Sequence, residues 1–200
     1  MSYELALANR IRAIERELEQ LKTLDPGASR AYADGLESPV KIIAVKSAVF
    51  TGTQAASVAA GASFAITDLE ITHTLAKSTN KILLMGEIGV SASSGEGGGV
   101  GTAFSVDGSL ILIGTAGGNR TRVAAGSHPS LVDEGDYISN QHSISGIYEP
   151  ESASSLVYRL NALNPSTVTR TIYINHFSTD TDISGRMRGV SSLILIEMEE

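Results

Sequence analysis

Three short stretches of this chain are apolar at every position, and they constrain the fold more than any other feature. They are residues 82–85 (Ile-Leu-Leu-Met), 110–113 (Leu-Ile-Leu-Ile) and 193–196 (Leu-Ile-Leu-Ile). Short apolar runs rich in β-branched residues are typical of strands, whose successive side chains point to opposite faces. A strand that is apolar on both sides must be covered on both sides, because exposed apolar patches are a liability on a soluble monomer.

The cover for the second face has two possible sources. No segment after residue 30 has a convincing helical period, so we expect a second copy of the chain to provide the cover. The alternative is that loops of the same chain, such as residues 114–130, fold over that face.

The rest of the region after residue 40 also has the composition of strands. We expect strands over residues 40–50, 69–75, 81–91, 156–163, 169–177 and 190–198, and a hairpin turn at Asp107-Gly108. Leu156, Tyr158, Leu160 and Ala162 share one face of their strand. The alanine-rich residues 55–62 are the one place where a helical turn is considered. Many short strands, with 20 glycines available for tight turns, predict a β-sandwich or barrel.

The N-terminal residues have a different pattern, which predicts a coiled coil. Residues 2–24 contain no Gly or Pro, and Leu7, Ile11, Ile14, Leu18 and Leu21 are spaced 4, 3, 4 and 3 apart. This spacing is the apolar seam of a heptad repeat, with Ile11 and Leu18 at a positions and the others at d. Isoleucine at both a and d in one heptad favours three strands.

The charged residues beside this seam fit a parallel homo-oligomer. Arg10 at a g position faces Glu15 at the next e position of a neighbouring chain, and Glu17 faces Lys22 in the same way. The alternative is a single amphipathic helix that folds back on its own domain.

Asp25-Pro26-Gly27 ends the helical pattern, since proline removes a backbone donor and glycine tolerates left-handed geometry. We therefore expect three parts: a coiled-coil oligomerisation helix over residues 1–25, a linker over 26–39 and a β head domain over 40–200.

Composition excludes several classes of function. The net charge of −7 disfavours nucleic-acid binding, which requires a basic surface. The absence of cysteine removes disulfides, thiolate zinc sites and cysteine nucleophiles. The first residues do not resemble a secretory signal, and no apolar run is long enough to span a membrane, so we expect folding without export or membrane insertion.

The motifs for catalysis or cofactor binding are incomplete. The glycine-rich residues 95–101 lack the Gly-Lys-Ser/Thr ending of a phosphate loop, and His73, His128, His142 and His176 show no metal-ligand spacing. Asp180 and Asp182 begin a calcium-loop pattern, but position 12 is Ser191 rather than glutamate, so calcium binding stays open. The sequence therefore predicts no enzyme activity and no cofactor, and it assigns no metal-ligating residues.

Four stretches of the head resemble a known family. Residues 78–85 (STNKILLM), 114–122 (GTAGGNRTR), 170–175 (RTIYIN) and 185–198, which begin Gly-Arg-Met-Arg, are similar to the head domain of bacteriophage tail fibres and other virion appendages. The resemblance covers roughly residues 40–199. It implies a jelly-roll head like that of the complement and tumour-necrosis-factor families, trimeric and displayed on a virion.

These observations together predict a homotrimeric, tail-fibre-type virion protein that is assembled in the host cytoplasm and involved in attachment to the host surface. The N-terminal segment would contact other virion proteins, and the loops around residues 93–102, 116–129 and 178–188 would meet a host glycan or protein. The family's usual long shaft has no counterpart in these residues, which leaves a capsid decoration protein as the main alternative. A glycan-cleaving tailspike lacks positive support, since the chain has no Trp to stack on sugars.

Overall fold

The computed structural model describes residues 40–93, 99–115, 118, 121–127, 140–176 and 189–199. The chain divides into two compact units, residues 1–40 and residues 41–200, and every described strand belongs to the second unit. The predicted coiled coil and linker lie outside the described residues, as do all the seam and charge-pair residues named for them, and they stay predictions.

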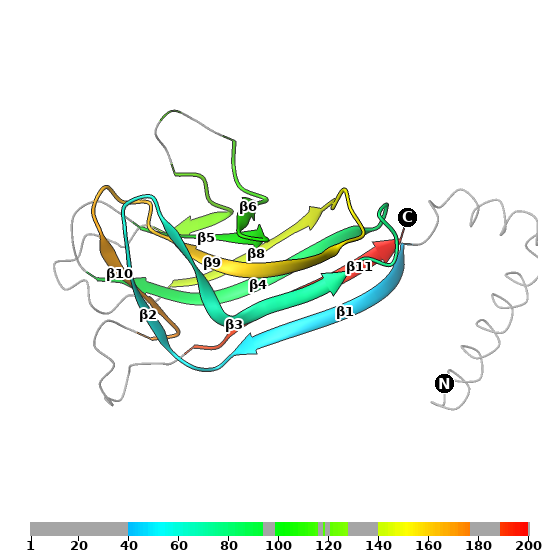
Figure 1. The fold of residues 1–200 in the computed structure, drawn as a ribbon. Helices are drawn as coiled ribbons and strands as arrows, with labels where there is room; N and C mark the ends of the chain where they lie inside the picture. The colour runs from blue at the N-terminus through cyan, green and yellow to red at the C-terminus, as the bar shows by residue number, and fades with distance from the viewer. Residues whose placement is uncertain are drawn as a thin grey trace, which may run out of the picture. The chain divides into compact units, whose positions relative to one another are not determined.

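Eleven strands form the described part of the head (Figure 1). Their bounds are β1 Lys41–Phe50, β2 Gln54–Val58, β3 Ser63–Thr74, β4 Lys81–Ala92, β5 Val100–Val106, β6 Ser109–Ile111, β7 Ala125–Ser127, β8 Asn140–Tyr148, β9 Ser155–Leu163, β10 Arg170–Ile174 and β11 Ser191–Glu199.

The strands form two curved antiparallel sheets, one above the other (Figure 1). The six-stranded sheet has the order β1-β11-β4-β10-β2, with β8 also paired to β4, and the five-stranded sheet has the order β3-β9-β5-β6, with β7 also paired to β5. When the short strands β2, β7 and β10 are set aside, the remaining strands pair in a nested order along the chain. The first strand pairs with the last, the second with the second-last, and so on: β1–β11, β3–β9, β4–β8 and β5–β6. This winding confirms the prediction of a mainly β, jelly-roll-like sandwich.

The core lies between the two sheets and is built from the alternate residues that face inward. Tyr158, Leu160 and Ala162 of β9 are fully buried, as their alternation predicts. Ile82, Leu84 and Ile88 of β4 and Leu193 and Leu195 of β11 meet them from the six-stranded sheet; they belong to the same buried cluster. These side chains dominate the stability of the fold, since full burial of each contributes about 1.5–3 kcal/mol.

The Asp107-Gly108 turn between β5 and β6 also forms as predicted. Both residues have positive φ, 47° and 86°, which is the requirement of a type I′ hairpin turn. The Asp107 side chain accepts a hydrogen bond from the backbone N–H of Val157, which fastens the turn to β9.

Two segments of this region differ from a simple reading of the sequence. In the alanine-rich stretch 55–62, residues 55–58 belong to strand β2, which pairs with β10 along its whole length, and a turn follows at residues 60–61. The apolar run 110–113 is not a strand throughout: β6 ends at Ile111 because Leu112 has a φ of 53°. The Leu112 side chain instead packs over Gly146 of β8, where no larger side chain would fit.

Lys41 at the start of β1 pairs with Glu199 at the end of β11, so the described head begins and ends at the same end of these two neighbouring strands (Figure 1). Lys41 and Lys77 both form ion pairs with Glu199 there.

Candidate functional site

The outer face of the six-stranded sheet carries apolar side chains in rows that cross four strands. One row consists of Val45, Ile196, Leu83 and Ile147, which are neighbours in register across β1, β11, β4 and β8. Its two outer members are well exposed, Val45 at 60% and Ile147 at 54%. The two central members, Leu83 and Ile196, are half-buried.

The row is part of a larger apolar surface, which we call the outer apolar face. Its described members are Ile42, Val45, Val49, Leu83, Met85, Ile147, Ile194, Ile196 and Met198. Leu83 and Met85 on β4 and Ile194 and Ile196 on β11 belong to two of the runs that the sequence showed to be apolar on both sides. These two runs form strands as expected: one set of side chains enters the core and the other faces outward, and the cover of the outward set by a second copy stays a prediction.

A shallow groove of about 380 Å³ crosses this face. Its lining consists of Met85, Gly86, Glu87, Ser143, Ile144, Ser145, Ser192 and Ile194. The small serines on β8 and β11 flank the larger residues of β4, so the groove combines an apolar floor, three hydroxyls and one carboxylate. Ser143 is within 3.5 Å of Glu87 Oε1, and no described cation pairs with Glu87.

A buried carboxylate holds the opposite side of β11 in place. Glu197 is 1% exposed and accepts three hydrogen bonds: from the backbone N–H of Ala76 at 2.8 Å, from Asn80 Nδ2 at 2.6 Å and from His73 Nε2 at 2.9 Å. These donors come from β3 and from the connection between β3 and β4. The cluster therefore links both sheets to the strand that carries Ile194 and Ile196.

Burial by itself would raise the pKa of Glu197, but the hydrogen bonds from Asn80, Ala76 and His73 hold that pKa below its ordinary value. The carboxylate therefore stays ionised inside the protein and accepts all three bonds. Burial also raises the pKa of the nearby Tyr158 hydroxyl to about 12, with further contributions from Tyr148, Asp107 and Glu197.

A second polar cluster contains His142, whose pKa is lowered by burial. Thr102 Oγ1 lies 3.4 Å from the carbonyl of Ala125 and 3.2 Å from His142 Nδ1, so the threonine hydroxyl donates to the carbonyl and accepts from the ring. His142 Nε2 then accepts from the Ser127 hydroxyl at 2.9 Å. Serine beside histidine is also the pairing of a nucleophile with its base, but His142 is buried between the sheets, so the cluster serves to join β5, β7 and β8.

The other predicted sites mostly fall outside the described residues. These include the heptad residues, His128, Asp180, Asp182 and most of the glycine-rich loop. Among the histidines that are described, His73 and His142 have the core roles given above, and His176 Nε2 bonds the Gln54 carbonyl. Within the described ranges no three metal-ligating side chains gather, and no helix is long and apolar enough to cross a membrane.

Sequence reasoning missed Glu197 and Glu87. Glu197 sits between Ile196 and Met198, where a carboxylate in a strand is ordinarily placed on the solvent side. The alternation with Leu193 and Leu195 was the signal that could have placed it inside. Nothing in the sequence marked Glu87, because its surroundings come from β8 and β11, which are distant in the chain.

The chain matches no known family model and no curated protein. A solved structure that the chain matches is that of infectious bursal disease virus, Gx strain, with 11% identity and a TM-score of 0.37. The match covers 78% of this chain and 39% of the viral chain. A likeness of this size bears on neither the family nor the function of this protein.

Proposed function

We propose that this chain is a virion structural protein: a homotrimeric appendage of the tail-fibre type that takes part in attachment to the host surface. The observation that carries the proposal is the outer apolar face of the six-stranded sheet. Its row of Val45, Ile196, Leu83 and Ile147 crosses the four neighbouring strands of a folded domain. An apolar surface of this kind on a soluble protein marks an interaction site.

A second copy of the chain is the partner that fits this face best. The heptad seam through Leu7, Ile11, Ile14, Leu18 and Leu21 predicts self-association independently of the head. The heptad seam and the outer apolar face would then join the same copies of the chain, the seam through a stalk and the face through the six-stranded sheet. The residues of the seam favour three strands, and the resemblance of the head to virion appendages implies three copies as well.

A trimer suits attachment because surface glycans and proteins on a cell are often bound weakly. Three linked binding sites raise avidity without any new contact in each site. In this arrangement the outer apolar face is buried between copies, and the surfaces of the head that lie outside the contacts between copies are left for the host.

The location of the protein on virus particles tests the proposal. Antibodies against the head should label the tail or its appendages in electron micrographs of particles, and the purified chain should compete with particles for adsorption to host cells. Label over the whole capsid shell, with no competition, would instead favour the capsid decoration protein. Absence of label from intact particles would contradict both.

A further inference from the structure

We infer that the groove on the outer apolar face binds the Arg122 side chain of a second copy, with Glu87 as the partner of its guanidinium. This inference rests on the proposed self-association and adds the contact that orients it. The observations that support it are the residues that line the groove and the contacts of Glu87 and Arg122.

The groove has the chemistry that an arginine side chain requires. Met85 and Ile194 offer an apolar floor for the methylene groups of the side chain. Glu87 offers a carboxylate, and the hydroxyls of Ser143 and Ser192 can accept further hydrogen bonds. A guanidinium has five N–H donors in a planar arrangement and binds a carboxylate through two of them, which a lysine cannot do.

Arg122 is the described arginine that is available for such a contact. Arg159 already pairs with Glu70, at 2.7 Å, and Arg170 is buried. Arg122 is exposed, and its Nε donates to the Gly114 carbonyl at 2.7 Å, which leaves the two terminal nitrogens for another partner. Lys46 also lacks a described carboxylate partner, but its ammonium donates to the Thr72 carbonyl and so joins the two sheets.

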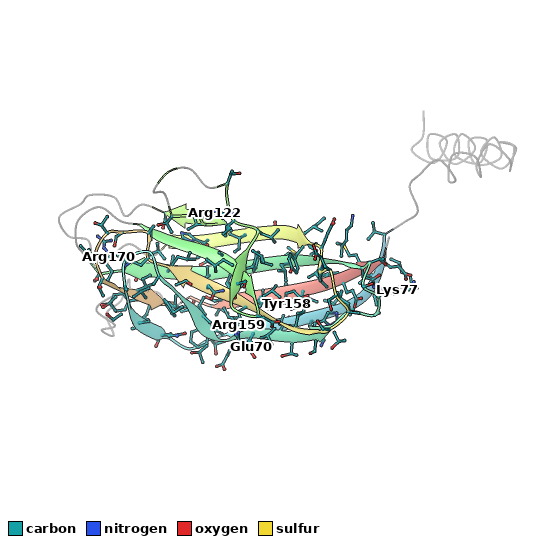
Figure 2. The ribbon with its side chains drawn as sticks, turned by 45° about the horizontal axis from the view of Figure 1, so that its top comes forward. Glu70, Lys77, Arg122, Tyr158, Arg159 and Arg170 are labelled. Atoms are coloured by element: carbon teal, nitrogen blue, oxygen red, sulfur yellow. The ribbon has the colours of Figure 1, made fainter. Side chains whose placement is uncertain are left out.

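No described ion pair joins Glu87 and Arg122 within one copy. Glu87 lies on the outer face of the six-stranded sheet, whereas Arg122 precedes β7, which belongs to the five-stranded sheet. Figure 2 shows Arg122 on the side of the view opposite Glu70 and Arg159. A contact between Glu87 of one copy and Arg122 of the next is heterologous, and in the proposed trimer three such contacts would close a ring.

Cross-linking of the full chain tests this contact directly, because the natural sequence has no cysteine. A variant with Glu87→Cys and Arg122→Cys, treated with a short bismaleimide, should give covalent species that end at three chains. The matched control is Glu151→Cys with Arg122→Cys, which keeps one cysteine and moves the other to the exposed turn after β8. The control should give no covalently linked chains under the same conditions.

A charge exchange provides a second readout. Glu87→Arg and Arg122→Glu should each raise the dissociation constant of the trimer about tenfold or more, since each leaves like charges opposed. The double variant should restore most of the affinity. If the chain is oligomeric but shows neither the cross-link nor the rescue, the Glu87–Arg122 contact is wrong and the proposed function stands; if the natural chain is a single copy in solution, both fall.

Discussion

At the scale of single residues, Glu197 has an environment that departs strongly from what a glutamate ordinarily prefers. An ionised carboxylate inside a protein is costly unless hydrogen bonds replace its water. Here the backbone N–H of Ala76, the amide of Asn80 and the ring of His73 provide that replacement. The cluster fixes the connection between β3 and β4 against β11, and so fixes the strand at the centre of the outer apolar face.

This placement predicts a dependence of stability on pH. The pKa of Glu197 is lowered in the folded protein, so its contribution is fully present above the pKa of this glutamate in the unfolded chain, about 4.5, and is lost as the pH falls through the lower folded value. Glu197→Gln should lower the free energy of unfolding at pH 7 by about 1–3 kcal/mol and remove this part of the acid dependence. Denaturant unfolding at a series of pH values measures both effects.

The control for Glu197 is Glu149→Gln. Glu149 is exposed and forms a surface ion pair with Lys81, so its replacement should change the free energy of unfolding by less than about 1 kcal/mol. Equal effects of the two substitutions at pH 7 would show that the buried cluster does not hold β11.

At the scale of elements, β11 divides its residues between two roles. Leu193, Leu195 and Glu197 face the interior, and Ile194, Ile196 and Met198 face outward. The same alternation occurs in β4, next to it in the sheet. Two neighbouring residues of similar size therefore serve different purposes, one in folding and the other in the proposed association.

Substitution of these neighbours should separate the two roles. Leu195→Ala leaves a cavity in the core and should cost about 2–5 kcal/mol of stability. Ile196→Ser should cost the separate head little, but it should reduce the dependence of the unfolding midpoint on protein concentration, which is the sign of an associated chain. Thermal unfolding over a hundredfold range of protein concentration distinguishes the two variants. If only Leu195→Ala removed the dependence of the unfolding midpoint on concentration, the assigned roles would be contradicted.

The sequence predicted this division because its signal is local. Strands β4, β9 and β11 were predicted from alternation or unbroken apolar runs, and the Asp107-Gly108 turn from two adjacent residues. Strand β8 was not predicted, because its outward residues Gln141, Ser143 and Ser145 are polar and its apolar residues are few. The groove was beyond prediction for a different reason: its walls come from three strands that meet only after folding.

At the scale of the whole molecule, the account places self-association at the centre of function. The head would bury its outer apolar face against neighbouring copies, and the predicted coiled coil would hold the same copies from the N-terminal side. The two contacts can be separated experimentally, because residues 1–40 and 41–200 form different units of the chain.

The most direct test is the mass in solution of the full chain carrying Ile11→Asp and Ile14→Asp, which remove the predicted seam. We expect about three times the chain mass of 20.9 kDa by light scattering. Adding Val45→Ser and Ile147→Ser on the outer apolar face should reduce this to the mass of one chain. Adding Val168→Ser, at a valine that is 48% exposed outside this face, should leave it unchanged. A single-chain mass for the seam variant at every concentration, or an unchanged oligomer after the two substitutions on the face, would contradict the account.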